Sequence, residues 1–164
     1  EAAKRYDGIK VDKERRVIDF GDRARFAFGK SNLAADQESV LRQFVPEILS
    51  LANDDLGKKV LKRVVVEGYT DKTGSYLSNL NLSLQRSQRV LCTMFATGGA
   101  NLLSDPQKED VRSLFLVGGY SFNAAKDKDE ESRRVEMRME FLGMNERRAA
   151  AMAPSGNFGD CALR

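Results

Sequence analysis

The sequence predicts an α/β protein, a two-layer sandwich in which helices pack on one face of a mixed β-sheet. One observation is a run of β-branched residues within positions 62–67 that stops at Gly68, as a buried strand does. Residues 35–52 and 79–95 flank this run and carry apolar side chains at helical spacing. Residues 134–141 alternate apolar and charged side chains, which indicates a further strand. This order of elements favours helices layered on one sheet.

The N-terminal residues are expected to form a linker remnant and a hairpin. Residues 1–8 are polar, and residues 9–11 and 17–20 alternate apolar and polar side chains around the polar stretch 12–15. We expect this hairpin to lead into the main domain.

Residues 25–28 are predicted to form the first main strand. Phe26 and Phe28 then lie on one face of the sheet, because alternate residues of a strand share a face. The amphipathic helix at 35–52 follows. Its buried face is predicted to carry Val40, Leu41, Phe44, Ile48 and Leu51.

The central strand is followed by a loop at residues 69–74. Such a loop leaves the carboxyl edge of the sheet, where α/β proteins bind their ligands. The next helix is expected to run until Gly98 and Gly99 stop it. Its buried face is predicted to carry Ser87, Val90, Leu91, Met94 and Phe95.

In the last third of the chain, Asp105 is predicted to cap a short helix, with Pro106 at its first position. Residues 114–117 are predicted to form a buried strand. The strict alternation at 134–141 indicates an edge or one-sided strand with one wet face. Residues 147–152 are compatible with a short helix.

Four residues define a candidate ligand site. Asn79, Leu82 and Arg86 are spaced so that they share one helix face, and Asp71 lies in the loop that faces the start of this helix. A carboxylate and a guanidinium then flank one cleft, which suits a zwitterion. The alternative is a surface salt bridge that holds the loop to the helix.

Composition argues against several other functions. The chain of 164 residues has 41 % hydrophobic residues, enough for one domain, and no apolar run long enough to span a membrane. It has no His, and Cys92 and Cys161 lie 69 positions apart, which does not fit zinc sites. Cys92 lies on the apolar side of its helix, where a thiol is usually inert. We therefore expect no catalytic residue, no metal and no cofactor.

The net charge of +3 comes from scattered pairs of basic residues rather than from a basic stripe. A basic module that binds nucleic acid or an acidic protein remains the alternative function. Because the chain begins at Glu1, we expect a mature product or a fragment, attached to a membrane only through an upstream anchor.

The central motif resembles a known family. The motif consists of Gly68-Tyr69-Thr70-Asp71, Gly74, Asn79, Leu82-Ser83, Arg86 and Val90. With residues 26–33 and the run Arg133-Arg134-Val135-Glu136, it resembles the OmpA-like peptidoglycan-binding domain of OmpA, Pal and the flagellar stator protein MotB. Ser78 departs from the pattern, since an aromatic residue is usual there.

This resemblance implies a βαβαβ core with a closing strand at residues 17–142, after the linker and hairpin at 1–16 and before a C-terminal extension at 143–164. It also implies a non-catalytic domain in the periplasm of a diderm bacterium that tethers a membrane protein to peptidoglycan. A stator-type parent is favoured, either MotB-like or the ZorB component of a phage-defence motor. An outer-membrane protein or lipoprotein remains open, as does a homodimer.

The ligand implied by the family is the meso-diaminopimelate of the stem peptide. Asp71 is then expected to hold its ammonium group and Arg86 its carboxylate, so that removing either side chain abolishes binding and leaves the fold intact. The remaining contacts are expected from Thr70, Asn79, Leu82 and Arg134. The implied oxidising compartment also favours a disulfide between Cys92 and Cys161 over two unrelated thiols.

Overall fold

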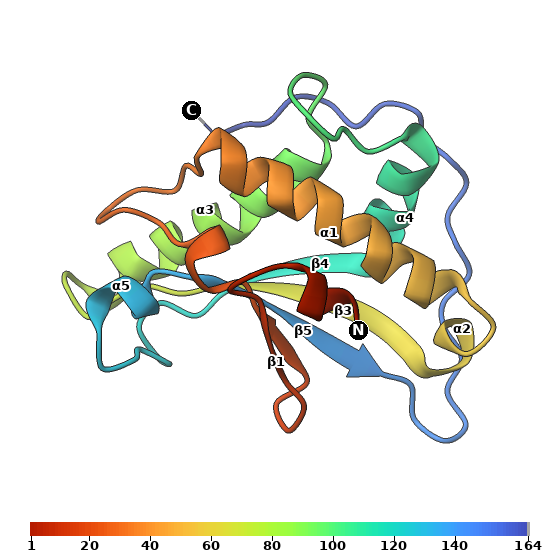
Figure 1. The fold of residues 1–164 in the computed structure, drawn as a ribbon, viewed down its shortest axis with the longest axis horizontal. Helices are drawn as coiled ribbons and strands as arrows, with labels where there is room; N and C mark the ends of the chain where they lie inside the picture. The colour runs from red at the N-terminus through yellow and green to blue at the C-terminus, as the bar shows by residue number, and fades with distance from the viewer. Residues whose placement is uncertain (164) are drawn as a thin grey trace.

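The computed structural model describes residues 1–163, apart from the side chain of residue 2, and places the main helices on one face of a single sheet (Figure 1). The strands are β1 (Lys10–Asp12), β2 (Val17–Asp19), β3 (Leu61–Gly68), β4 (Phe115–Gly119) and β5 (Val135–Phe141). Their order is β1-β2-β5-β3-β4, with β3 and β4 parallel and the other neighbours antiparallel. The predicted two-layer sandwich with a mixed sheet is confirmed.

The helices are α1 (Ala35–Asn53), α2 (Gly57–Val60), α3 (Tyr76–Met94), α4 (Asp105–Leu114) and α5 (Asp129–Ser132), with 3₁₀ turns η1 (Ala2–Arg5) and η2 (Gly21–Ala24). Helices α1, α3 and α4 correspond to predicted helices, whereas α2, α5 and the two 3₁₀ turns were not predicted. Helix α3 ends at Met94, one turn before the glycines that were expected to stop it. Among residues 1–163, no helix is both long and apolar enough to cross a membrane.

The core lies between α1, α3 and the covered face of the sheet. Val66 pairs with Met137, which in turn pairs with Ile18, so these three side chains share the covered face across three strands. Phe44 of α1 packs edge-to-face against Phe20, with ring centroids 5.4 Å apart. All five are buried, and their apolar area supplies the main stabilisation of the fold.

The positions of β4 and β5 differ from the prediction. Strand β5 is not an edge strand, because it pairs with β2 on one side and β3 on the other. The charged face of β5 is also not fully exposed to solvent. Glu136 on this face is fully buried and accepts hydrogen bonds from Arg15 and Arg134. Strand β4 occupies the edge instead, with Leu116 and Val117 partly exposed.

Residues 25–28 do not form the expected strand. Arg25 makes an isolated bridge with Arg134, and the chain turns at residues 27–30, where the N–H of Lys30 bonds to the carbonyl of Ala27. Phe26 is buried whereas Phe28 is 62 % exposed, so the two rings do not share a face. The neighbour of β5 on the side away from β3 is β2, which belongs to the N-terminal hairpin.

Three other local predictions are corrected. The predicted linker at 1–8 contains the turn η1, and Tyr6 packs on Phe44 and bonds to Glu47. Helix α4 is capped by Ser104 rather than Asp105, because its hydroxyl accepts from the N–H of Gln107 in a capping box. Residues 147–152 are not helical.

The C-terminal residues run along the outside of the helical layer, past α4 and on to α3, without forming a helix or strand (Figure 1). The Arg148 guanidinium donates to the carbonyls of Leu61, Ala52 and Gly57 near α2. Farther along, the structure joins Cys161 to Cys92 of α3 by a disulfide, with the two Cα atoms 5.4 Å apart. The segment is therefore fastened at both ends of its path.

Candidate functional site

A cavity of about 180 Å³ lies where the loop after β3 meets the start of α3. Helix α3 approaches the strand end closely because residue 68 is glycine: a Cβ there would lie 2.0 Å from the carbonyl oxygen of Ser83. The cavity brings together five of the six predicted ligand-binding residues. Its lining consists of Phe28, Gly29, Thr70, Asp71, Thr73, Ser78, Asn79, Leu82 and Arg86.

Arg86 is fully buried beside this cavity. Its guanidinium donates to the carbonyls of Tyr69 at 2.8 Å, Lys30 at 2.9 Å and Ala27 at 3.3 Å, and it lies over the ring of Phe26. Burial lowers the pKa of Arg86 to about 10, although the charge of Asp71 opposes this effect. The expectation that Arg86 can be removed with the fold intact overlooked these contacts, through which the residue also fastens two loops.

Asp71 is buried and held in place by two donors. Its Oδ1 accepts from the N–H of Thr73, and its Oδ2 accepts from Nη1 of Arg133, each at 3.0 Å. The alternative salt bridge between Asp71 and Arg86 is absent from the ion pairs of residues 1–163, in which Arg133 pairs with Asp71. Two guanidinium groups thus lie near one carboxylate, and the site has an excess of positive charge.

Thr70 and Asn79 complete the polar lining. Within residues 1–163, the hydroxyl of Thr70 is the one buried side-chain oxygen or nitrogen that lacks a hydrogen-bond partner. Buried polar groups without partners are rare and mark positions where a ligand or water can bind. The amide nitrogen of Asn79 donates to the carbonyls of Thr73 and Ser75, so its oxygen is what Asn79 can offer to a ligand.

Arg134 does not line the cavity. It is buried on the face of the sheet opposite the main helices, where Nε donates to Glu136 at 2.8 Å and the guanidinium stacks over Tyr69. Burial, followed by the hydrogen bond to Glu67, raises the pKa of Tyr69. Two adjacent residues just before β5 thus have different partners: Arg133 donates to Asp71, and Arg134 belongs to a buried ionic cluster.

Sequence reasoning missed Arg133, Thr73 and Phe28 as neighbours of the site. The family resemblance named Arg134 of the Arg133-Arg134 pair as a contact, whereas its neighbour Arg133 is the one that reaches Asp71. No signal placed Phe28 there, since its alternation with Phe26 predicted a core strand.

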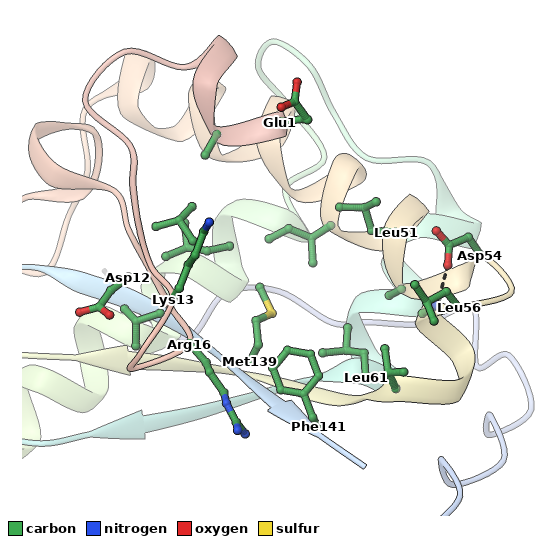
Figure 2. Close-up of a pocket in the computed structure, with 18 of the residues that line it drawn as sticks. Glu1, Asp12, Lys13, Arg16, Leu51, Asp54, Leu56, Leu61, Met139 and Phe141 are labelled. Carbon is green, nitrogen blue, oxygen red and sulfur yellow. Dashed lines mark hydrogen bonds between the residues drawn. The ribbon is translucent and has the colours of Figure 1, made fainter. Parts of the chain in front are cut away.

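A larger hollow of about 600 Å³ lies between the N-terminal hairpin, the end of α1 and the end of β5 (Figure 2). Its lining is mainly apolar and includes Leu51, Leu56, Leu61, Met139 and Phe141. None of the predicted site residues lines it. The small polar cavity is therefore the candidate site.

The chain is similar in sequence to one known family and to one known protein. The sequence model of the OmpA family matches residues 25–105, which include the cavity residues. The Zorya protein ZorB of Escherichia coli O139:H28 (strain E24377A / ETEC) is 43 % identical over 145 residues, or 87 % of this chain. This chain spans 59 % of the length of that relative.

Two solved structures share the fold. The periplasmic domain of Helicobacter pylori MotB is 15 % identical with a TM-score of 0.55, and the match covers 85 % of this chain and 91 % of that one. The OmpA-like domain of FopA1 from Francisella tularensis subsp. tularensis SCHU S4 is 18 % identical with a TM-score of 0.51, covering 82 % of each chain.

Proposed function

This chain carries an OmpA-like domain, and on that premise we propose that it anchors a stator-type membrane protein to peptidoglycan in the periplasm of a diderm bacterium. The relatedness to ZorB and the fold shared with MotB support a motor protein as the parent. The domain acts by binding rather than by catalysis.

We infer that the ligand is the diaminopimelate of the stem peptide, whose free end carries an ammonium and a carboxylate. The observation that carries this inference is the cavity itself, which combines a buried carboxylate, a buried guanidinium and the unpartnered hydroxyl of Thr70. A guanidinium has five N–H donors, of which Arg86 spends three on backbone carbonyls. Two remain for the ligand carboxylate, and the nearby Arg133 adds to the positive potential that attracts it.

Asp71 receives the ammonium group in this arrangement. Its carboxylate is already fixed by Thr73 and Arg133, so little conformational entropy is lost when the ligand binds. Asn79 accepts a hydrogen bond through its free oxygen, and Leu82 packs against the ligand's methylene groups.

Sedimentation with purified sacculi tests this function. The wild-type protein is expected to sediment with sacculi, and free meso-diaminopimelate is expected to release it. Asp71→Asn is expected to stay in the supernatant, whereas the matched control Asp127→Asn, at an exposed position, is expected to sediment normally. If the wild-type protein stayed in the supernatant, wall binding would be refuted. If diaminopimelate did not release the sedimented protein, the proposed ligand would be refuted.

A further inference from the structure

We propose that Phe28 is a specificity-determining residue that packs against the aliphatic chain of the bound diamino acid. This inference rests on the proposed function of the cavity and extends it to the apolar part of the ligand. Phe28 lines the cavity and is 62 % exposed. A large aromatic side chain left in water beside a polar cavity gains free energy when a ligand covers it.

The backbone that carries Phe28 is held firmly. The turn at 27–30 is closed by the hydrogen bond from the N–H of Lys30 to the carbonyl of Ala27. Gly29, at the third position of this turn, takes a φ of +65°, which glycine adopts without strain. Arg86 donates to the carbonyls of Ala27 and Lys30 on either side of Phe28. The ring is thus presented by a turn that the buried arginine fixes, and binding need not order this backbone.

Arg86 also lines the cavity at its charged end. The residue that fixes the turn of Phe28 is therefore the one proposed to bind the ligand carboxylate. The lining otherwise provides hydroxyl groups from Thr70, Thr73 and Ser78, and one aliphatic side chain, Leu82. Ser78 is small and bonds to Ser75, so it provides little apolar surface. Phe28 and Leu82 together supply the apolar surface for a ligand with a charged end and a chain of methylene groups.

The ring therefore distinguishes ligands by their aliphatic part, as Asp71 and Arg86 distinguish them by charge. Covering one to two methylene groups changes affinity by roughly tenfold. Because the contact is apolar, this factor should be the same at low and at high salt, unlike the contribution of the charged residues.

Calorimetry with a soluble, sugar-free diaminopimelate stem peptide tests the proposal. Phe28→Ala is expected to weaken binding roughly tenfold at both salt concentrations, and Phe28→Leu is expected to retain most of the affinity. Leu77→Ala removes a comparably exposed side chain of α3 that does not line the cavity, and it should bind as the wild type does. An unchanged melting temperature of Phe28→Ala would exclude a folding effect, as expected for an exposed side chain.

Equal peptide affinities of Phe28→Ala and the wild type would overturn this inference alone. A loss of binding to sacculi without a loss of binding to the peptide would also overturn it, because the ring would then contact the glycan. If the wild type itself bound neither the peptide nor sacculi, the proposed function would fall, and this inference with it.

Discussion

Arg133 donates a hydrogen bond from Nη1 to Oδ2 of Asp71 at 3.0 Å, and both side chains are largely buried. The two residues are 62 positions apart in the sequence, and the pair ties the loop after β3 to the residue just before β5. The geometry of the cavity thus depends on an arginine outside the central motif. Its neighbour Arg134, which the sequence suggested as a site residue, pairs with Glu136 instead.

The first prediction concerns Arg134. Arg134→Ala is expected to lower the free energy of unfolding by about 3 kcal/mol, because within residues 1–163 the fully buried Glu136 then keeps Arg15 as its one cationic partner. Folded Arg134→Ala is nevertheless expected to sediment with sacculi, since the residue does not line the cavity. Urea unfolding and sedimentation measure the two effects, with the exposed Arg147→Ala as control. If Arg134→Ala folded but did not bind sacculi, Arg134 would be shown to take part in ligand binding.

The second prediction separates the two roles of Arg86. Arg86→Ala is expected to lower the free energy of unfolding by about 3 kcal/mol, because three backbone carbonyls lose their donor. Arg86→Lys retains a cation, but an ammonium group does not reproduce the planar set of donors, so sacculus binding is expected to fail. Hydrogen exchange should show faster opening of residues 27–30 in both variants. Unchanged stability of Arg86→Ala would show that the carbonyl contacts contribute little.

The third prediction concerns pH. Burial by itself raises the pKa of Asp19, but hydrogen bonds from the N–H of Gly21 and from Lys126 more than offset this and lower it below the usual value. The contribution of Asp19 to stability is therefore complete above the unfolded pKa of about 3.9, and it is lost as pH falls through the folded pKa. Asp19→Asn is expected to be less stable than the wild type at neutral pH.

That difference should shrink in acid. Free energies of unfolding from urea titrations, measured from neutral pH to below the usual carboxyl pKa, test this for both proteins. A difference that stays constant across the whole range would show that Asp19 has the same pKa in the folded and unfolded states.

The fourth prediction concerns the disulfide between Cys92 and Cys161. Because the two residues are 69 positions apart, the chain-entropy model assigns the bridge about 4 kcal/mol of stabilisation. The double variant Cys92→Ser, Cys161→Ser is expected to lose up to this amount and to show faster hydrogen exchange in residues 149–163. A dithiol reductant should shift the wild type to the same stability and leave the variant unchanged. Equal effects of the reductant on both proteins would contradict this.

The central strand, loop and helix were predictable because their signals are local. The valines at 64–66 and the stop at Gly68 indicated β3, and the helical spacing of Asn79, Leu82 and Arg86 placed them on one face, where the structure has them. Such patterns depend only on the period of the element that carries them.

The failed predictions depend on distant partners. The alternation at β5 indicated one charged face. Whether that face is exposed to solvent depends on distant residues, because Arg15 and Arg134 donate hydrogen bonds to the buried Glu136. Likewise, Phe26 and Phe28 have the spacing of a strand, but residues 27–30 form a turn, and Arg86 of α3 donates to the carbonyls of Ala27 and Lys30. The choice between Arg133 and Arg134 has the same origin, since only the tertiary fold decides which one faces Asp71.

The most direct test of the proposed recognition is calorimetry with two stem peptides that differ only in their diamino acid. A lysine-type peptide keeps the ammonium group for Asp71 but lacks the second carboxylate, so Arg86 would lose a partner. A buried guanidinium without that partner costs about 1–3 kcal/mol, which corresponds to roughly a tenfold to hundredfold difference in affinity. We predict tighter binding of the diaminopimelate peptide by this factor, and equal affinities for the two peptides would contradict the proposed role of Arg86.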